Sequence, residues 1–191
     1  MTDLDRALLI AKKFCIDGEI NDIHPYGSGI INDTYLVTTS SLKYPRLIQQ
    51  RLNSAVFPHP DQVMANMSKI TLHIAKKENK FSKLDHRRFE LPTIIAAKDG
   101  GDYVVDADGE FWRVMSYIPR TCTSTSIHSL AQAQEVGYVL GRFERLLSDL
   151  DASLLYDTLP GFHITPRYLR QLDDVMSGLN TFPNAAEIAY C

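Results

Sequence analysis

The chain has 191 residues, of which 45% are hydrophobic and 23% are charged, and its formal net charge is −3. This balance is typical of a folded globular protein and excludes a disordered, collagen-like or coiled-coil chain. An acidic chain has no overall charge that would attract nucleic acid or an anionic membrane. We therefore expect neither a nucleic-acid partner nor a membrane partner.

The cysteines and the N-terminal residues indicate the compartment. Cys15, Cys122 and Cys191 are far apart in the sequence and fit neither a disulfide framework nor a zinc site. At the N-terminus, acidic residues precede a very short apolar run, which is the reverse of the charge order in a signal peptide. These features predict a cytoplasmic protein.

Two segments of the first 120 residues have helical periodicity. Apolar side chains recur at helical spacing from residue 5 to residue 14, and Gly18 follows as a stop signal, so we predict a leading helix within residues 3–17. Residues 59–77 repeat apolar side chains at steps of three and four after Pro60, which is favoured in the first turn of a helix. We expect this second helix to cross a sheet.

The other elements of this region have strand composition and are bounded by Gly, Asp and Ser turns. The predicted strands are residues 23–29, 33–39, 46–53, 91–97, 103–106 and 111–118. The first three predict an antiparallel meander. The fold class that we expect is α+β, with one helix crossing the sheet.

The composition changes after Pro119. A Thr/Ser-rich stretch leads into helical patterns over residues 128–150 and 166–176, and the strand signals stop. We therefore divide the chain into a strand-rich part, residues 1–119, and a helical part, residues 120–191. The first of these helices has an apolar face with few partners in so short a helical part, so we expect self-association through it.

A glycine turn between the first two strands is a candidate binding site. In Gly27-Ser28-Gly29-Ile30-Ile31-Asn32, two glycines let the backbone approach a ligand closely, with its N–H groups toward phosphate oxygens. The strand–turn–strand context differs from a dinucleotide fingerprint and matches the nucleotide loops of kinases. Taken alone, the segment also fits an ordinary hairpin.

Two further candidates lie on strands. Arg51 ends the third strand, where a kinase-like fold needs a cation for the phosphates. Alternation puts Leu47, Gln49 and Arg51 on one face, which is too polar for a core face, so a ligand cleft and open solvent both remain open. The strand of residues 111–118 runs into the boundary and offers backbone groups to a planar base, or is simply a buried strand.

Taken together, these segments resemble the aminoglycoside phosphotransferase and choline kinase superfamily, and within it the N-acetylhexosamine 1-kinase branch. The strings that carry the resemblance are residues 27–35, 48–53, 112–114, 141–143 and 159–166. The resemblance implies a protein-kinase-like fold whose small lobe binds ATP, with Mg²⁺, and whose helical lobe holds the substrate and the catalytic residues.

The resemblance also implies roles for individual residues. Gly27, Ser28, Gly29, Asn32 and Thr34 would cover the phosphates, and Arg51 would be the cation on the third strand. The hinge that contacts adenine would consist of Met115, Ser116, Tyr117 and Ile118. His163 lies in a turn that either caps a helix or contacts a sugar-like substrate.

The sequence departs from this family in three ways. Ile30 stands where a histidine is common, and Met64-Ala65-Asn66 offers an amide where the crossing helix should carry an acid. After the boundary there is no His-x-Asp-x-x-x-x-Asn loop and no metal-binding Asp, because Asp22, Asp61 and Asp85, the aspartates near a histidine, all lie before it. We therefore expect the catalytic residues and the Mg²⁺ ligands to lie outside this chain.

These inferences lead to one main hypothesis and two alternatives. We predict the N-terminal portion of an ATP-dependent sugar kinase that transfers the γ-phosphate to a hydroxyl and that is inactive as this chain stands. One alternative is a non-catalytic module, derived from a kinase, that binds a nucleotide or a protein. The other is a structural domain with no nucleotide site.

Overall fold

The structure is a computed structural model, and it describes residues 2–81 and 87–178. The chain divides into two units, Met1–Thr158 and Leu159–Cys191, and each is treated separately below. The boundary predicted after residue 119 falls inside the first unit, between its last strand and its third helix.

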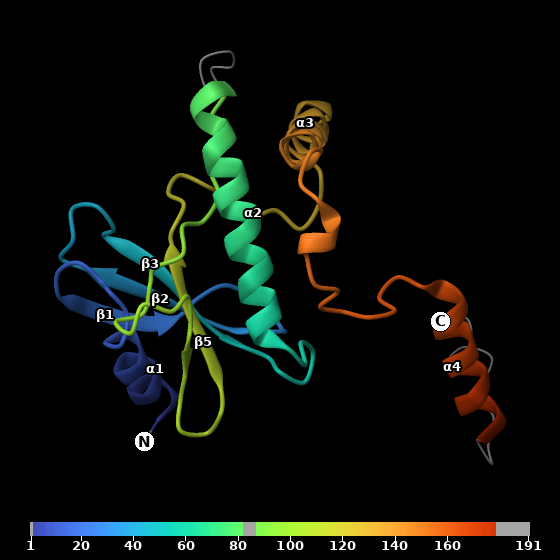
Figure 1. Cartoon of the computed structure of the whole chain (residues 1–191), viewed down its shortest axis with the longest axis horizontal. Coiled ribbons are helices and arrows are strands. Elements are labelled where there is room, and N and C mark those ends of the chain that lie inside the picture. The colour runs from blue at the N-terminus through green and yellow to red at the C-terminus, as the bar shows by residue number, and fades with distance from the viewer. Residues whose placement is uncertain (1, 82–86, 179–191) are drawn as a thin grey trace. The chain divides into compact units, whose positions relative to one another are not determined.

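The first unit consists of a sheet, three α-helices and a short 3-10 helix (Figure 1). The elements in chain order are α1 (Asp3–Ala11), β1 (Ile20–Pro25), β2 (Asp33–Thr39), β3 (Arg46–Leu52), α2 (Pro60–Phe81), β4 (Val104–Val105), β5 (Phe111–Ser116), α3 (Leu130–Leu147) and η1 (Ala152–Leu154). The second unit contains α4 (Thr165–Gly178).

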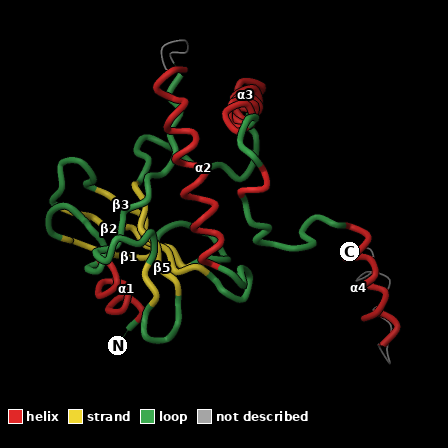
Figure 2. The backbone as a smooth tube through the Cα atoms, in the orientation of Figure 1, coloured by secondary structure: helices red, strands yellow, loops and turns green. Residues whose placement is uncertain are grey.

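The five strands form one antiparallel sheet in the order β1-β2-β3-β5-β4 (Figure 2). The first three strands are a meander, as the sequence predicts, and the chain then passes through α2 before β5 returns beside β3. The register pairs Thr34 with Gln50 and Gln50 with Arg113 across the three central strands. The predicted α+β fold class is confirmed.

Each face of the sheet has its own helix, and we name the faces accordingly. On the α1 face, Tyr35, Val37 and Trp112 pack in one core cluster with Phe14 and the side chains of α1. On the α2 face, Arg113 contacts Met64 and Met67, which project from α2. Because strand side chains alternate between faces, Thr34 and Gln50 lie on the α2 face with Arg113, whereas Tyr35 and Gln49 lie on the α1 face.

Several predicted bounds differ from the structure. The leading helix starts with a capping box between Thr2 and Asp5 and ends at Ala11, well short of residue 17. β1 begins three residues earlier than predicted and ends at Pro25, because Gly27 adopts a positive φ of 82° that leaves the extended conformation.

The predicted strand over residues 91–97 is wrong. This segment makes isolated bridges, Ile94 with Met115 and Phe14 with Ala97, instead of a ladder. Pro92 cannot donate a hydrogen bond, and the main-chain bonds that do form link Thr93 and Ile95 to β5, Ala96 to Cys15, and Ala97 to Gly101. The segment therefore runs beside β5 as an irregular strap.

α3 is attached to α2 by polar contacts near its C-terminal end. Asp149 accepts hydrogen bonds from His73, at 2.9 Å, and from Lys77, which also donates to the carbonyl oxygen of Leu146 at 2.8 Å. Further toward its N-terminus the helix exposes Val139 and Leu140, with exposed fractions of 47% and 56%. Self-association through this face stays a prediction.

Over residues 2–81 and 87–178, no helix combines the length and the apolar character that crossing a bilayer requires.

Candidate nucleotide site

The glycine turn predicted as the phosphate loop occupies residues 26–32, between β1 and β2. Its ends are closed by a hydrogen bond of 2.8 Å from the N–H of Tyr26 to the carbonyl oxygen of Thr34. The side-chain oxygen of Asn32 accepts a hydrogen bond of 3.0 Å from the N–H of Asn53, which follows β3. Asn32 therefore fixes the turn to the neighbouring strand end rather than pointing freely at a ligand.

The backbone of this turn is accessible. Within the described part of the chain, the N–H groups of residues 27–31 make no hydrogen bond. A Cβ placed on Gly27 or Gly29 would meet no atom within 4 Å, and Ile30 at the tip is 97% exposed. These N–H groups can therefore donate to an anion without breaking an existing bond.

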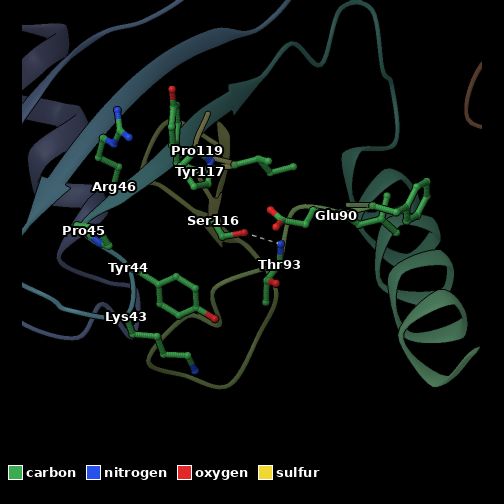
Figure 3. A pocket seen from close by; sticks show the side chains of 12 residues that line it. Lys43, Tyr44, Pro45, Arg46, Glu90, Thr93, Ser116, Tyr117 and Pro119 are labelled. Atoms are coloured by element: carbon green, nitrogen blue, oxygen red, sulfur yellow. Dashed lines mark hydrogen bonds between the residues drawn. The ribbon is translucent and has the colours of Figure 1, made fainter. Parts of the chain in front are cut away.

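The predicted hinge consists of the last two residues of β5 and the two residues that follow it. Met115 is buried, and Ser116 exchanges two hydrogen bonds of 2.8 Å with the backbone of Thr93, one of them through its side-chain oxygen (Figure 3). The N–H of Tyr117 lies 3.4 Å from the carbonyl oxygen of Arg46, and the carbonyl oxygen of Ile118 accepts a hydrogen bond from Thr121. The strap and β3 thus hold the hinge in place.

A pocket of about 350 Å³ lies beside the hinge (Figure 3). It is lined by Lys43, Tyr44, Pro45, Arg46, Phe89, Glu90, Leu91, Thr93, Ser116, Tyr117, Ile118 and Pro119. Three of the four predicted hinge residues, all except Met115, contribute to this lining.

The fold brings the glycine turn to the hinge. The hydroxyl oxygens of Tyr26 and Tyr117 are 3.4 Å apart, and the two rings meet edge to face with centroids 6.1 Å apart. The hydrogen bond to Tyr117 raises the pKa of Tyr26 above its ordinary value. Tyr117 also carries the guanidinium of Arg46 over its ring, at 4.3 Å from the centroid. Two segments that are 91 residues apart in sequence are therefore neighbours here.

Arg51 lies on the α1 face and already has a carboxylate partner. Its guanidinium binds Asp33 at 2.7 Å through Nε and at 2.5 Å through a terminal nitrogen, and it lies 5.8 Å from the ring centroid of Trp112. Burial by itself lowers the pKa of Arg51, but the hydrogen bond to Asp33 and the attraction of the nearby acidic groups together outweigh burial, and the pKa is raised. The proposed role of Arg51 toward phosphates stays a prediction.

The interpretation that this face is too polar for a core is wrong. Leu47 and Gln49, which share the face with Arg51, are both fully buried. Gln49 is accommodated because its side-chain amide donates a hydrogen bond of 2.9 Å to the carbonyl oxygen of Ala7 in α1.

The sequence reasoning missed a polar chain on the opposite face. Arg113 of β5 donates to the side-chain oxygen of Gln50 from Nε at 3.1 Å and from a terminal nitrogen at 2.7 Å. The amide nitrogen of Gln50 in turn donates to the hydroxyl of Thr34 at 3.0 Å. The sequence contains one indication of this chain. Side chains alternate along a strand, so Arg113 lies on the α2 face while its neighbours Trp112 and Val114 lie on the α1 face.

Among the described side chains of the crossing helix, none that contacts Arg113 is acidic. The neighbours there are the sulfur atoms of Met67 at 3.4 Å and Met64 at 3.9 Å. The side chain of Asn66 bonds to Tyr156 and not to Arg113. Its amide nitrogen donates to the carbonyl oxygen of Tyr156 at 2.8 Å, and its oxygen accepts from the N–H of Tyr156 at 2.9 Å.

One stretch of α2 repeats the spacing of the kinase catalytic loop in its letters. His59, Asp61 and Asn66 follow the pattern His-x-Asp-x-x-x-x-Asn. The structure places Asp61 and Asn66 in the first two turns of a regular helix, and the amide of Asn66 is fully engaged with Tyr156. The stretch therefore forms the start of the crossing helix and not a catalytic loop.

His163 belongs to the second unit. It has a positive φ of 60°, and its ring centroid is 3.9 Å from that of Phe162. Nearby, Arg167 donates a hydrogen bond of 3.2 Å to the carbonyl oxygen of Pro160 and closes the turn before α4. The role of His163 toward a substrate stays a prediction.

The donors that Mg²⁺ prefers are not assembled in this part of the chain. Over residues 2–81 and 87–178, no three His, Cys, Asp or Glu side chains come together as a metal site. We therefore assign no step to a metal bound by these residues.

The sheet order, the crossing helix and the glycine turn define a kinase-like phosphotransferase fold. The crystal structure of an aminoglycoside phosphotransferase from Alicyclobacillus acidocaldarius shares it, with a TM-score of 0.54 and 16% sequence identity. The match covers 93% of this chain and 46% of that one, so the chain spans about half the length of this phosphotransferase. No protein-family model matches the sequence. At this identity the likeness shows the fold, and the predicted kinase-like fold is confirmed.

Proposed function

We propose that this chain is the nucleotide-binding part of a phosphotransferase that transfers the γ-phosphate of ATP to a hydroxyl of a small molecule. The observation that carries the proposal is the contact between Tyr26 and Tyr117. Tyr26 adjoins the glycine turn and Tyr117 belongs to the end of β5, so the elements suited to phosphate and to base lie within the span of one nucleotide. The kinase-like fold supports the same interpretation.

Each element contributes a different interaction. The free N–H groups of residues 27–31 suit phosphate oxygens, because successive main-chain donors form a concave anion site. The ring of Tyr117, which lines the pocket beside the hinge, suits a purine, because every base has an aromatic face that stacks. Binding of this kind positions the triphosphate, which is most of what a phosphoryl-transfer enzyme must do.

The acceptor in this proposal is a sugar hydroxyl of the N-acetylhexosamine type. Its support is the resemblance of the sequence strings, and His163 is the residue of this chain proposed to contact the sugar. In such an enzyme, bound Mg²⁺ neutralises the charge of the phosphates during transfer.

A nucleotide-binding module without catalysis is the second candidate. The observation in its favour is that the sequence after residue 120 has no His-x-Asp segment, so this chain offers no residue to orient an acceptor hydroxyl. Both candidates share the nucleotide site and differ in whether phosphate is transferred.

Calorimetric titration of the chain with ATP, ADP and adenosine tests the shared site. We expect each to bind with a stoichiometry of one, and we expect adenosine to compete with ATP. If neither ATP nor adenosine binds at millimolar concentration, the proposal is overturned. Release of ADP in the presence of N-acetylglucosamine or N-acetylgalactosamine and Mg²⁺ then separates the two candidates, since only a phosphotransferase releases ADP in a sugar-dependent way.

A further inference from the structure

Arg113 has an unusual environment for a charged side chain. It lies in the middle of β5, is only partly accessible, and faces α2 while its sequence neighbours Trp112 and Val114 are buried on the opposite face. Burial lowers the pKa of Arg113 below the ordinary value of a guanidinium. An arginine nevertheless stays protonated in proteins, so the position holds a full positive charge.

Among the described residues, the hydrogen-bond acceptors of this guanidinium are all neutral. The acceptors are the side-chain oxygen of Gln50 and the sulfur atoms of Met64 and Met67. Among the described residues, no carboxylate lies within ion-pair distance of Arg113. By contrast, Arg6, Arg51 and Arg88 each bind a carboxylate at 2.6 Å or less.

A partly buried charge without a counter-ion is costly, and proteins normally pair it or use it. Gln50 is informative here, because a Glu at the same position would make the same two hydrogen bonds and also neutralise the guanidinium. A glutamine holds the guanidinium in a fixed orientation and leaves its charge available. This arrangement is what an anion-binding arginine requires.

Hydrogen bonds link the guanidinium of Arg113 to the strand that follows the glycine turn. Thr34 is the first residue of β2 after the turn whose side chain is on the α2 face, and the chain Thr34–Gln50–Arg113 runs from there across β3 to β5. These hydrogen bonds therefore connect the guanidinium to the strand end that directly follows the glycine turn. A guanidinium also matches the geometry of phosphate oxygens.

We infer that Arg113, oriented by Gln50, is the phosphate-binding cation of the nucleotide site. The inference rests on the proposed function, and it gives to a residue of β5 the role that the sequence reasoning gave to Arg51 of β3. Arg51 differs from Arg113 in its charge and in its position, since Asp33 neutralises it and it lies on the α1 face.

Two variants test the charge in different ways. Arg113→Met removes the charge and keeps an unbranched chain of similar length. Gln50→Glu keeps Arg113 and its hydrogen bonds and supplies an internal counter-ion. Arg51→Met makes the same substitution at the rival cation on the neighbouring strand. Thermal melts of all three establish that they fold, and if Arg113→Met does not, Gln50→Glu and Arg113→Lys decide.

The measurement is calorimetric titration with ATP, adenosine and tripolyphosphate. We expect Arg113→Met and Gln50→Glu to weaken ATP binding about 10- to 100-fold, as one or two charge-assisted hydrogen bonds would, and to leave adenosine binding unchanged. We expect Arg113→Lys to retain part of the affinity and Arg51→Met to reduce the affinity for ATP far less than Arg113→Met does.

The other outcomes separate this inference from the proposed function. If adenosine and ATP bind and the Arg113 and Gln50 variants bind ATP normally, the inference is overturned and the proposed function stands. If no nucleoside binds but tripolyphosphate does, and the two variants abolish it, the anion site stands and the proposed function fails. If the unmodified chain binds neither nucleotide nor tripolyphosphate, both are overturned.

Discussion

The side-chain amide of Gln49, in the middle of β3, donates a hydrogen bond of 2.9 Å to the main-chain carbonyl oxygen of Ala7 in α1. Gln49 is fully buried, and its own side-chain oxygen has no hydrogen-bond partner among the described residues. One polar contact thus attaches α1 to the sheet while one buried oxygen stays unsatisfied. An unsatisfied buried acceptor costs about 1–3 kcal/mol, more than a single neutral hydrogen bond contributes.

Two substitutions at Gln49 should therefore separate the effect of side-chain shape on stability from the effect of side-chain polarity. Gln49→Met removes the hydrogen bond and the unsatisfied oxygen together, and we expect the free energy of unfolding to change by less than about 1 kcal/mol. Gln49→Glu places a carboxylate in the same dry site and should lower the free energy of unfolding at pH 7 by about 3 kcal/mol or more. Urea unfolding measures both. A Gln49→Glu variant as stable as the unmodified chain would contradict this packing.

Asp106 connects α1 to the turn between β4 and β5. One of its oxygens accepts hydrogen bonds from Arg6, at 2.9 and 2.6 Å, and from the indole of Trp112 at 2.7 Å. The other oxygen accepts from the N–H groups of Asp108 and Glu110. Burial alone would raise the pKa of Asp106, but the hydrogen bonds from Trp112, from Arg6 and from the two N–H groups together outweigh burial, and the pKa lies below its ordinary value.

The lowered pKa of Asp106 predicts the direction of a pH effect. Its stabilising contribution is fully present above the pKa of an unfolded Asp, about 4, and is lost as the pH falls through the lower pKa of the folded state. We expect Asp106→Asn to cost about 3 kcal/mol at pH 7, because it leaves Arg6 without its buried partner. The same variant should also show a weaker loss of stability between about pH 4 and pH 2.

Asp108→Asn is the control for this experiment. Asp108 also binds Arg6, at 2.9 Å, but its side chain is 69% exposed, so the pair is screened by water. We expect Asp108→Asn to change the free energy of unfolding by less than about 1 kcal/mol. Equal losses for the two variants would show that Asp106 is not the organising partner.

The comparison of Gln49 with Arg113 shows what the sequence can predict. Alternation identifies which residues of β3 share a face, because the period of two is a property of every strand. It does not identify the helix that covers that face, and a polar residue such as Gln49 is core once a carbonyl oxygen such as that of Ala7 reaches it. The burial of Arg113 likewise depends on α2, a partner distant in sequence.

Local sequence patterns predicted the bounds of some strands better than they predicted which sheet face is buried. The bounds of β2 match the prediction, and those of β3 differ from it by one residue, because turns flank both strands and their composition suits a sheet. Residues 91–97 have the same composition, yet they form an irregular strap whose bonds are divided between β5, Cys15 and Gly101. The contact of Tyr26 with Tyr117 could not be predicted, because it depends on the strand order.

Asn66 provides a test of how α2 holds the segment that follows α3. Its two hydrogen bonds to the backbone of Tyr156 are of 2.8 and 2.9 Å, and Lys69, one turn further on, donates to the carbonyl oxygen of Leu154. Asn66→Ala removes both bonds to Tyr156, each contributing about 1 kcal/mol. We expect amide hydrogen exchange of residues 152–157 to become faster by about tenfold or more, with little change in the sheet.

Lys76→Ala is the control for Asn66→Ala, because Lys76 is an exposed residue of the same helix. Exchange over residues 152–157 should be unaffected by it. Faster exchange across the whole sheet in Asn66→Ala would instead indicate global destabilisation and would contradict a local fastening role for Asn66.

Tyr117 is the residue whose replacement should affect the base rather than the phosphates. Base–aromatic stacking contributes about 1–3 kcal/mol, so we expect Tyr117→Ala to weaken adenosine and ATP binding by the same factor, about tenfold. Arg113→Met, in contrast, should weaken ATP binding alone.

Tyr117→Phe keeps the stacking surface and removes the hydroxyl that Tyr26 contacts, so we expect normal adenosine affinity. Because the hydrogen bond to Tyr117 raises the pKa of Tyr26, that pKa should fall toward its ordinary value in Tyr117→Phe, which ultraviolet titration of the tyrosines measures. If adenosine binds to Tyr117→Ala as tightly as to the unmodified chain, the base lies elsewhere.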